Sequence, residues 1–68
     1  MQGTIKSVRL DGRFGFIKPH GFHPRGELFF HATDLRGIDF DEQLIERDVL
    51  FELGKRDGRQ RALNVRSI

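Results

Sequence analysis

The stretch Gly12-Arg13-Phe14-Gly15-Phe16-Ile17-Lys18 decides how the rest of the chain is interpreted. At the two-residue period of a β-strand, Phe14, Phe16 and Lys18 share one face, and Gly15 lies on the other. Paired phenylalanines in strands are usually core residues, so alternation alone favours burial of Phe14 and Phe16. Gly15, however, leaves the opposite face bare, as expected where another backbone approaches closely or a barrel bends.

A second stretch, Leu28-Phe29-Phe30-His31, has the same organisation. Leu28 and Phe30 share one face, whereas Phe29 and His31 share the other. Two neighbouring strands that show rings beside basic residues form a stacking platform for unpaired bases. The pattern therefore leaves two interpretations open, a packed core face and a base-binding face.

The composition indicates one small domain over residues 1–68. A domain of this size buries only about 60% of the surface that its unfolded chain exposes. The absence of cysteine excludes disulfides and cysteine-ligated metals, and it permits a reducing compartment. His20 and His23 invite a metal site, but no carboxylate or thiol accompanies them at a recognisable ligand spacing. We therefore expect no cofactor.

The sequence contains no targeting or membrane signal. No apolar run approaches the roughly 20 residues of a membrane-spanning helix. The first residues lack the basic and apolar regions of a signal peptide. We therefore expect a soluble, cytoplasmic protein with no membrane partner, and among oligomeric states we favour a monomer.

The charges are unevenly distributed along the chain. The net charge of +2 is too small to indicate nucleic-acid binding by itself. Acidic residues crowd one segment, namely Asp39, Asp41, Glu42, Glu46 and Asp48. Basic residues crowd the C-terminal part, namely Lys55, Arg56, Arg59, Arg61 and Arg66. This distribution predicts a molecule with a basic and an acidic side, although a merely solvated charged surface is the alternative.

The alternation of residues predicts strands over 3–10, 13–18, 27–31, 49–53 and 62–67. Asp11-Gly12 is a turn dipeptide and indicates a hairpin between the first two strands. Val8 and Leu10 lie on the opposite parity from Ile5, which favours a bulge or a strong bend in the first strand. Five short strands without a clear helix predict a small antiparallel barrel, in which closure also removes exposed edges.

The connections are predicted less sharply than the strands. Residues 32–47 form a long connection, with a short helical turn at 33–35 that directs Leu35 inward. Residues 41–47 have helix-forming composition, but a helix of two turns is marginal by itself. Residues 54–59 are interpreted as a charged turn that contains glycine.

These residues resemble the cold-shock domain family. Phe14-Gly15-Phe16-Ile17 is similar to its first nucleic-acid-binding motif, and Leu28-Phe29-Phe30-His31 to its second, usually Val-Phe-Val-His. Gly3-Thr4-Ile5-Lys6 resembles the opening of the family pattern, and Ala62-Leu63-Asn64-Val65 its close. The motifs follow the family order over nearly the whole chain. The resemblance implies an all-β OB-fold, a five-stranded antiparallel Greek-key barrel that binds single-stranded RNA or DNA without catalysis.

The resemblance and the charge pattern together predict the nucleic-acid-binding residues. Phe14, Phe16, Phe29 and His31 match the stacking residues of the family, Lys6 matches a basic residue of the first strand, and Phe40 matches an aromatic residue of the long loop. The basic residues expected to contact phosphate are Lys6, Arg9, Arg13, Lys18 and Arg59, with Arg56 as an addition. The family core positions match Ile5, Ile17, Leu28, Phe30, Val49, Phe51 and Val65.

Two positions depart from the family pattern. Ser7 stands where the family has a large ring, and Ala32 stands where an aromatic residue usually follows the histidine. Each stacked base contributes about 1–3 kcal/mol, so the loss of two rings weakens binding unless other residues compensate. Candidates for that role are Arg9, Arg13, Arg25 and Phe22, the last two in a lengthened loop.

The sequence thus favours a single-strand nucleic-acid binder with modest sequence preference. A role as an RNA chaperone or a regulator of gene expression is what the resemblance implies. The alternative is a protein-interaction or assembly module that kept the barrel and lost part of its nucleic-acid face, as Ser7, Ala32 and the acidic residues 39–48 suggest. An enzyme is disfavoured, because no nucleophile or phosphate-cradling loop stands at a recognisable spacing.

Overall fold

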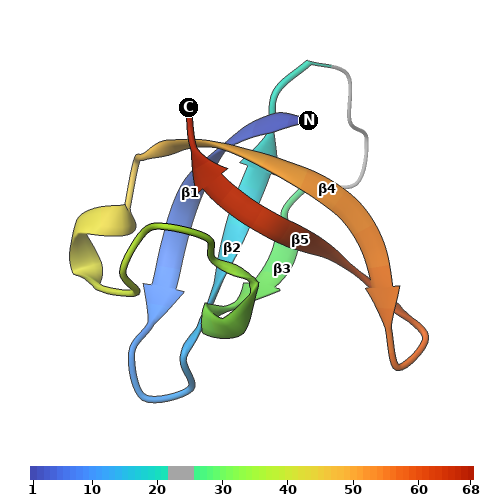
Figure 1. The fold of residues 1–68 in the computed structure, drawn as a ribbon, viewed down its shortest axis with the longest axis horizontal. Coiled ribbons are helices and arrows are strands. Elements are labelled where there is room, and N and C mark those ends of the chain that lie inside the picture. The colour runs from blue at the N-terminus through green and yellow to red at the C-terminus, as the bar shows by residue number, and fades with distance from the viewer. Residues whose placement is uncertain (22–25) are drawn as a thin grey trace.

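Five antiparallel strands and two short 3₁₀ turns make up the computed structural model, which describes residues 1–21 and 26–68. The elements, in chain order, are β1 (Gln2–Arg9), β2 (Phe14–Pro19), β3 (Leu28–His31), η1 (Ala32–Asp34), η2 (Glu42–Leu44), β4 (Asp48–Arg56) and β5 (Arg59–Ser67). Figure 1 shows β4 and β5 crossing in front of β1, β2 and β3. The predicted all-β class is confirmed.

The strand order is that of a Greek key. The sheet runs β3-β2-β1-β4-β5, so β1 pairs with both β2 and β4. Three consecutive strands are therefore followed by a fourth that returns through the long connection to lie beside the first, which defines the motif. The two ends of the sheet also meet, because β3 lies against β5 and Leu35 bridges to Val65 in parallel. The sheet thus curls into the predicted five-stranded barrel.

Two irregularities in pairing bend the strands around the core. The register of β1 against β2 shifts between Ile5 and Ser7, which confirms the predicted bulge in the first strand. A second shift between β4 and β5 coincides with Asn64, whose φ is 51°. This extra residue allows Ala62 and Val65, three positions apart, to be buried together.

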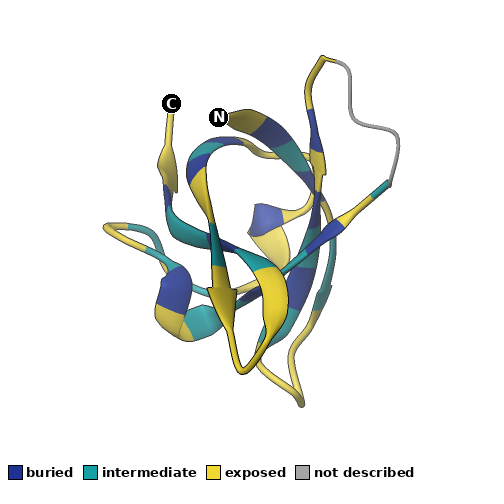
Figure 2. Ribbon diagram, turned by 90° about the vertical axis from the view of Figure 1, so that its right-hand side faces the viewer, coloured by how far each residue is buried: buried dark blue, intermediate teal, exposed yellow. Residues whose placement is uncertain are grey.

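The core confirms the inward positions expected from the sequence. The buried hydrophobic residues are Ile5, Ile17, Leu28, Phe30, Leu44, Val49, Phe51, Ala62 and Val65. Leu44 and Ala62 were not among the predicted core positions, and Leu35 is half-buried against this core. Figure 2 shows buried residues alternating with more exposed ones along the strands, as a curved sheet with one inner face requires.

Gly15 fixes which face of β2 points inward. A Cβ atom at Gly15 would lie 2.5 Å from the carbonyl oxygen of Ser7 and 2.8 Å from the ring of Phe30. Only glycine allows this approach of backbone and ring, as the sequence predicted. Because Gly15 and Ile17 point into the barrel, Phe14 and Phe16 point outward.

One of the predicted connections is wrong. The charged turn predicted over 54–59 is a two-residue hairpin, in which Asp57 and Gly58 have φ values of 52° and 78°. Positive φ at both positions matches the twist of the flanking strands, so pairing continues to Arg56 on one side and from Arg59 on the other.

The helix-forming segment 41–47 yields only the 3₁₀ turn η2. The side chain of Asp41 accepts a hydrogen bond from the backbone N–H of Gln43, and Glu46, with φ of 70°, directs the chain into β4. Too few residues are available here for a helix to propagate. Over the ranges 1–21 and 26–68, no helix is long and apolar enough to cross a membrane.

Candidate nucleic-acid interface

Strand pairing arranges the predicted site residues in rows on the outer face of β1, β2 and β3. Directly paired residues of antiparallel strands place their side chains on the same face. The first row is Arg9, Phe14 and His31; the second is Ser7, Phe16 and Phe29; the third is Thr4 and Lys18. The opposite face of these strands contributes Gly15, Ile17 and Phe30 to the buried core. The rows therefore form a continuous outer surface, which we call the ring face.

Phe14, Phe16 and Phe29 form an aromatic cluster at the centre of the ring face. The rings of Phe14 and Phe29 are stacked, with centroids 5.4 Å apart and planes at 26°. Phe16 meets each of them edge to face, with both centroid distances at 6.0 Å. All three residues are half-buried, so the cluster supports its own rings and still offers apolar surface to solvent.

His31 ends β3 with a ring whose orientation is fixed. Its Nδ1 accepts a hydrogen bond of 3.2 Å from the backbone N–H of Thr33. The backbone N–H of His31 donates to Oδ2 of Asp34 over 2.9 Å. These reciprocal contacts cap η1 and assign the proton of the neutral ring to Nε2. His31 therefore presents a half-buried ring with one hydrogen-bond donor beside Phe14.

The predicted basic residues differ in what they contact. Arg9 and Lys18 are exposed on the ring face. Lys6 is paired with Glu46 of the acidic segment, with Nζ and Oε2 3.0 Å apart. Its charge is thus balanced within the protein, although an exposed pair of this kind contributes only about 0–1 kcal/mol.

Arg13 and Phe40 come together outside the aromatic cluster. The guanidinium carbon of Arg13 lies 5.9 Å from the centroid of the Phe40 ring. That ring packs edge to face against the buried Phe30, at 6.4 Å. Within the described part of the chain, no ring contact joins Phe40 to the aromatic cluster.

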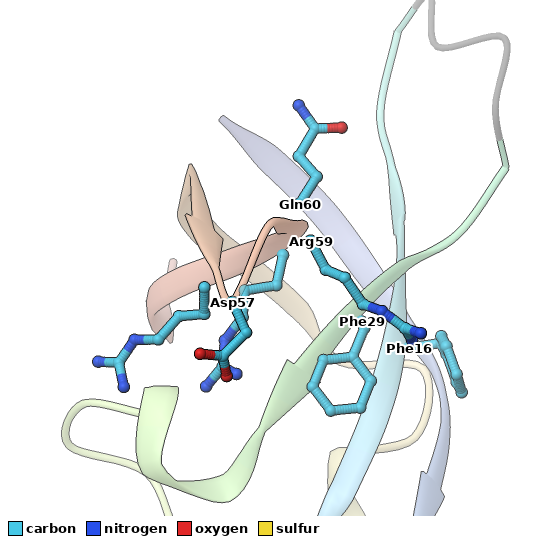
Figure 3. Close-up of a pocket in the computed structure, with 7 residues that line it drawn as sticks. Phe16, Phe29, Asp57, Arg59 and Gln60 are labelled. Carbon is cyan, nitrogen blue, oxygen red and sulfur yellow. The ribbon is translucent and has the colours of Figure 1, made fainter.

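A hollow of about 420 Å³ separates the aromatic cluster from the β4–β5 hairpin. Its lining consists of Phe16, Phe29, Arg56, Asp57, Arg59, Gln60 and Arg61. Figure 3 shows the side chain of Arg59 extending from the hairpin toward Phe16 and Phe29. Apolar rings beside guanidinium groups are suited to a stacked base and its phosphate.

Arg61 and this hollow were missed from the sequence because 54–59 was interpreted as a turn. Asp57-Gly58, the same dipeptide class as Asp11-Gly12, was the available signal for a two-residue hairpin. With that turn, a period of two places Arg59 and Arg61 on one face of β5. In the structure, Nη2 of Arg61 lies 2.8 Å from Oδ2 of Asp34.

A second, shallower hollow of about 400 Å³ lies beside β1 and the end of β2. Its lining consists of Thr4, Lys6, Lys18, Pro19, His20 and Gly21. Thr4 donates to Asp48 over 2.7 Å, and its hydroxyl lies 2.8 Å from Nε2 of His20. The remaining sequence-based candidates, Phe22, His23 and Arg25, lie outside the described residues.

A Greek-key barrel whose outer strand face carries rings and positive charges defines the class of oligonucleotide-binding barrels. The family described as 'Cold-shock' DNA-binding domain matches residues 1–68. The chain is 33% identical over 67 residues to probable cold shock protein A of Mycobacterium tuberculosis, with 98% of this chain and 97% of that protein covered. It is equally similar, over the same shares, to probable cold shock protein A of Mycolicibacterium smegmatis.

The chain therefore belongs to the cold-shock domain family, a family of nucleic-acid-binding domains. The resemblance found in the sequence motifs is confirmed.

Proposed function

We propose that this protein binds single-stranded RNA or DNA on its ring face, without catalysis and with modest sequence preference. The observation that carries the proposal is the outward aromatic cluster of Phe14, Phe16 and Phe29. A soluble strand normally turns polar side chains to water on its open face. Three rings in that place, beside His31 and exposed cations, are explained by ligands that have apolar faces and negative charge.

In the proposed mechanism, unpaired bases stack on the aromatic cluster and on His31. Arg9, Lys18 and Arg59 contact phosphates along the edges of the ring face. Lys6 contributes when phosphate replaces Glu46 as its partner. Arg13 and Phe40 have a lesser role, because Arg13 lies over the ring of Phe40, and that ring packs against Phe30 outside the aromatic cluster.

The proposal is tested by fluorescence anisotropy with a labelled short oligothymidine at several salt concentrations. We expect binding that weakens as salt rises, because each neutralised phosphate of a single strand contributes about −0.7 to the slope of log K against log salt. A few contacts predict a shallow slope. Absence of binding at low salt, by a protein shown to be folded, would contradict the proposal.

Substitution Ser7→Trp is expected to strengthen oligothymidine binding. Ser7 is paired with Phe16 at the centre of the ring face, so an indole there adds a stacking position worth about 1–3 kcal/mol, or roughly 5- to 150-fold. The chain has no tryptophan, so quenching of the new fluorescence reports binding directly.

The matched control for that gain is Ser67→Trp, an exposed serine at the end of β5. Its affinity for the oligothymidine is expected to remain at the wild-type value. If both tryptophan variants gained equally, the effect would be nonspecific and the position of the ring face would be wrong.

A second candidate function is a protein-interaction module. The pairing of Lys6 with Glu46 favours it, because the protein neutralises one of its own predicted phosphate contacts. Self-association of the purified protein, with no response to RNA or DNA, would support this alternative. An RNA-chaperone or regulatory role and a cytoplasmic location stay predictions.

A further inference from the structure

Arg61 differs from the other arginines of the β4–β5 hairpin in having its charge neutralised inside the protein. Arg56 and Arg59 are exposed, whereas the side chain of Arg61 is only 16% exposed. Its Nη2 and Nε lie 2.8 and 3.1 Å from Oδ2 of Asp34, whose side chain is 4% exposed. Because the buried carboxylate of Asp34 neutralises this guanidinium, Arg61 attracts a phosphate only weakly.

Asp34, which lies in η1, connects this turn to β3 and to β5 through one carboxylate oxygen. Its Oδ2 accepts from the backbone N–H of His31, at the end of β3, and from Arg61 of β5. The sheet order places β3 and β5 at opposite ends, so no strand ladder joins them. The Asp34–Arg61 pair therefore links the two ends of the sheet beside the ring face.

The same guanidinium also contacts the aromatic cluster. The guanidinium carbon of Arg61 lies 5.6 Å from the centroid of Phe29, within the range of a cation–π contact. Phe29 in turn contacts Phe14 and Phe16. The ring of Phe29 is thus bounded by two rings and by one cation, and that cation is held in place by Asp34.

We infer that Arg61 is a positioning residue for base stacking and not a phosphate contact. Held by Asp34, it fixes the ring of Phe29, while Asp34 fixes the backbone of His31. Arg59, exposed at the hairpin, is the residue that contacts phosphate on this side. The inference rests on the proposed function and specifies how its central ring is oriented.

The test compares two variants of matched design. Removing Arg61 alone would leave a buried, unpaired carboxylate, so Asp34→Asn is combined with Arg61→Gln. This double variant keeps the net charge and retains amide groups that can hydrogen-bond to each other and to His31. Arg59→Gln is the control, since it removes one exposed charge from the same strand.

Oligothymidine affinity and its salt slope are measured for both variants, with Phe29 and with Phe29→Ala. With Phe29 present, the double variant is expected to bind about 5- to 10-fold more weakly than the wild type, with an unchanged salt slope. In the Phe29→Ala background, the same two substitutions are expected to change the affinity by less than about 2-fold. Arg59→Gln is expected to make the slope shallower by about 0.7 in both backgrounds.

Two results would overturn the inference. If the salt slope became shallower in the double variant, as is expected for Arg59→Gln, Arg61 would be a phosphate contact. An equal loss of affinity with and without Phe29 would show that Arg61 does not act through that ring. If circular dichroism shows the double variant to be unfolded, Arg61→Lys takes its place. Lysine keeps the charge but lacks the planar fork, so the same loss at unchanged slope is expected.

A ligand-free readout separates this inference from the proposed function. In the free protein, the aromatic resonances of Phe29 are expected to shift more in the double variant than in Arg59→Gln, because the guanidinium of Arg61 contacts that ring directly. Unshifted Phe29 resonances would contradict the positioning role even if binding is strong. Failure of the wild-type protein to bind oligothymidine would contradict the proposed function, whatever the resonances show.

Discussion

Replacing Phe29 by alanine is expected to weaken oligothymidine binding by roughly 5- to 150-fold, because one stacked base contributes about 1–3 kcal/mol. The loss should fall toward the upper part of this range, since each ring of the aromatic cluster contacts the other two but Phe29 also contacts Arg61. Removing it takes away one stacking surface and leaves Phe14 without its parallel neighbour. Anisotropy titration at one fixed salt concentration measures the effect.

The control for this loss is Leu53→Ala, an exposed apolar residue of β4 that lies outside the ring face and its hollows. Its affinity is expected to equal that of the wild type. An unchanged affinity in Phe29→Ala, with the protein folded by circular dichroism, would remove the main support for a stacking platform.

Replacing the adjacent Phe30 by alanine is expected to act on stability instead. Phe30 is fully buried and packs against Gly15, and truncating a core phenylalanine lowers the free energy of unfolding by about 3–5 kcal/mol. At about 0.05–0.15 kcal/mol per residue, a chain of 68 residues has a total of only about 3–10 kcal/mol. Phe30→Ala should therefore lose a large part of this total.

Urea denaturation followed by far-ultraviolet circular dichroism measures this difference. Phe29→Ala is the matched comparison, because it makes the same chemical change one residue away on the opposite face of β3. We expect it to lose less than half the stability that Phe30→Ala loses. Equal losses would mean that the two faces of β3 are not distinguished as the structure indicates.

The inward face of the barrel was accessible from the sequence because it depends on local rules. These rules involve only residues close together in the sequence. They are the period-two alternation, the glycine where strands approach closely, and the change of parity at Val8. Leu44 was missed because only tertiary packing draws a residue of a marginal 3₁₀ turn into the core. The hairpin at Asp57 was missed because charged residues surround it and no apolar alternation marks the strand ends beside the turn, residues 54–56 and 59–61.

The interface was predictable in its rings and less so in its charges. Motif resemblance and alternation together placed Phe14, Phe16, Phe29 and His31, and strand pairing brings them onto one face. The partners of Lys6 and Arg61 lie 40 and 27 positions away along the chain, so no local pattern could reveal these ion pairs. Which cations remain available to phosphate is therefore a property of the closed barrel.

An amide chemical-shift titration with a short oligothymidine tests the central claim, that the ring face binds single-stranded nucleic acid, most directly. We expect the largest shifts at Arg9, Phe16 and Phe29 on the ring face and at Arg59 of the hairpin, with little change in η2. Absence of shifts, or a largest response within the acidic residues 39–48, would contradict it.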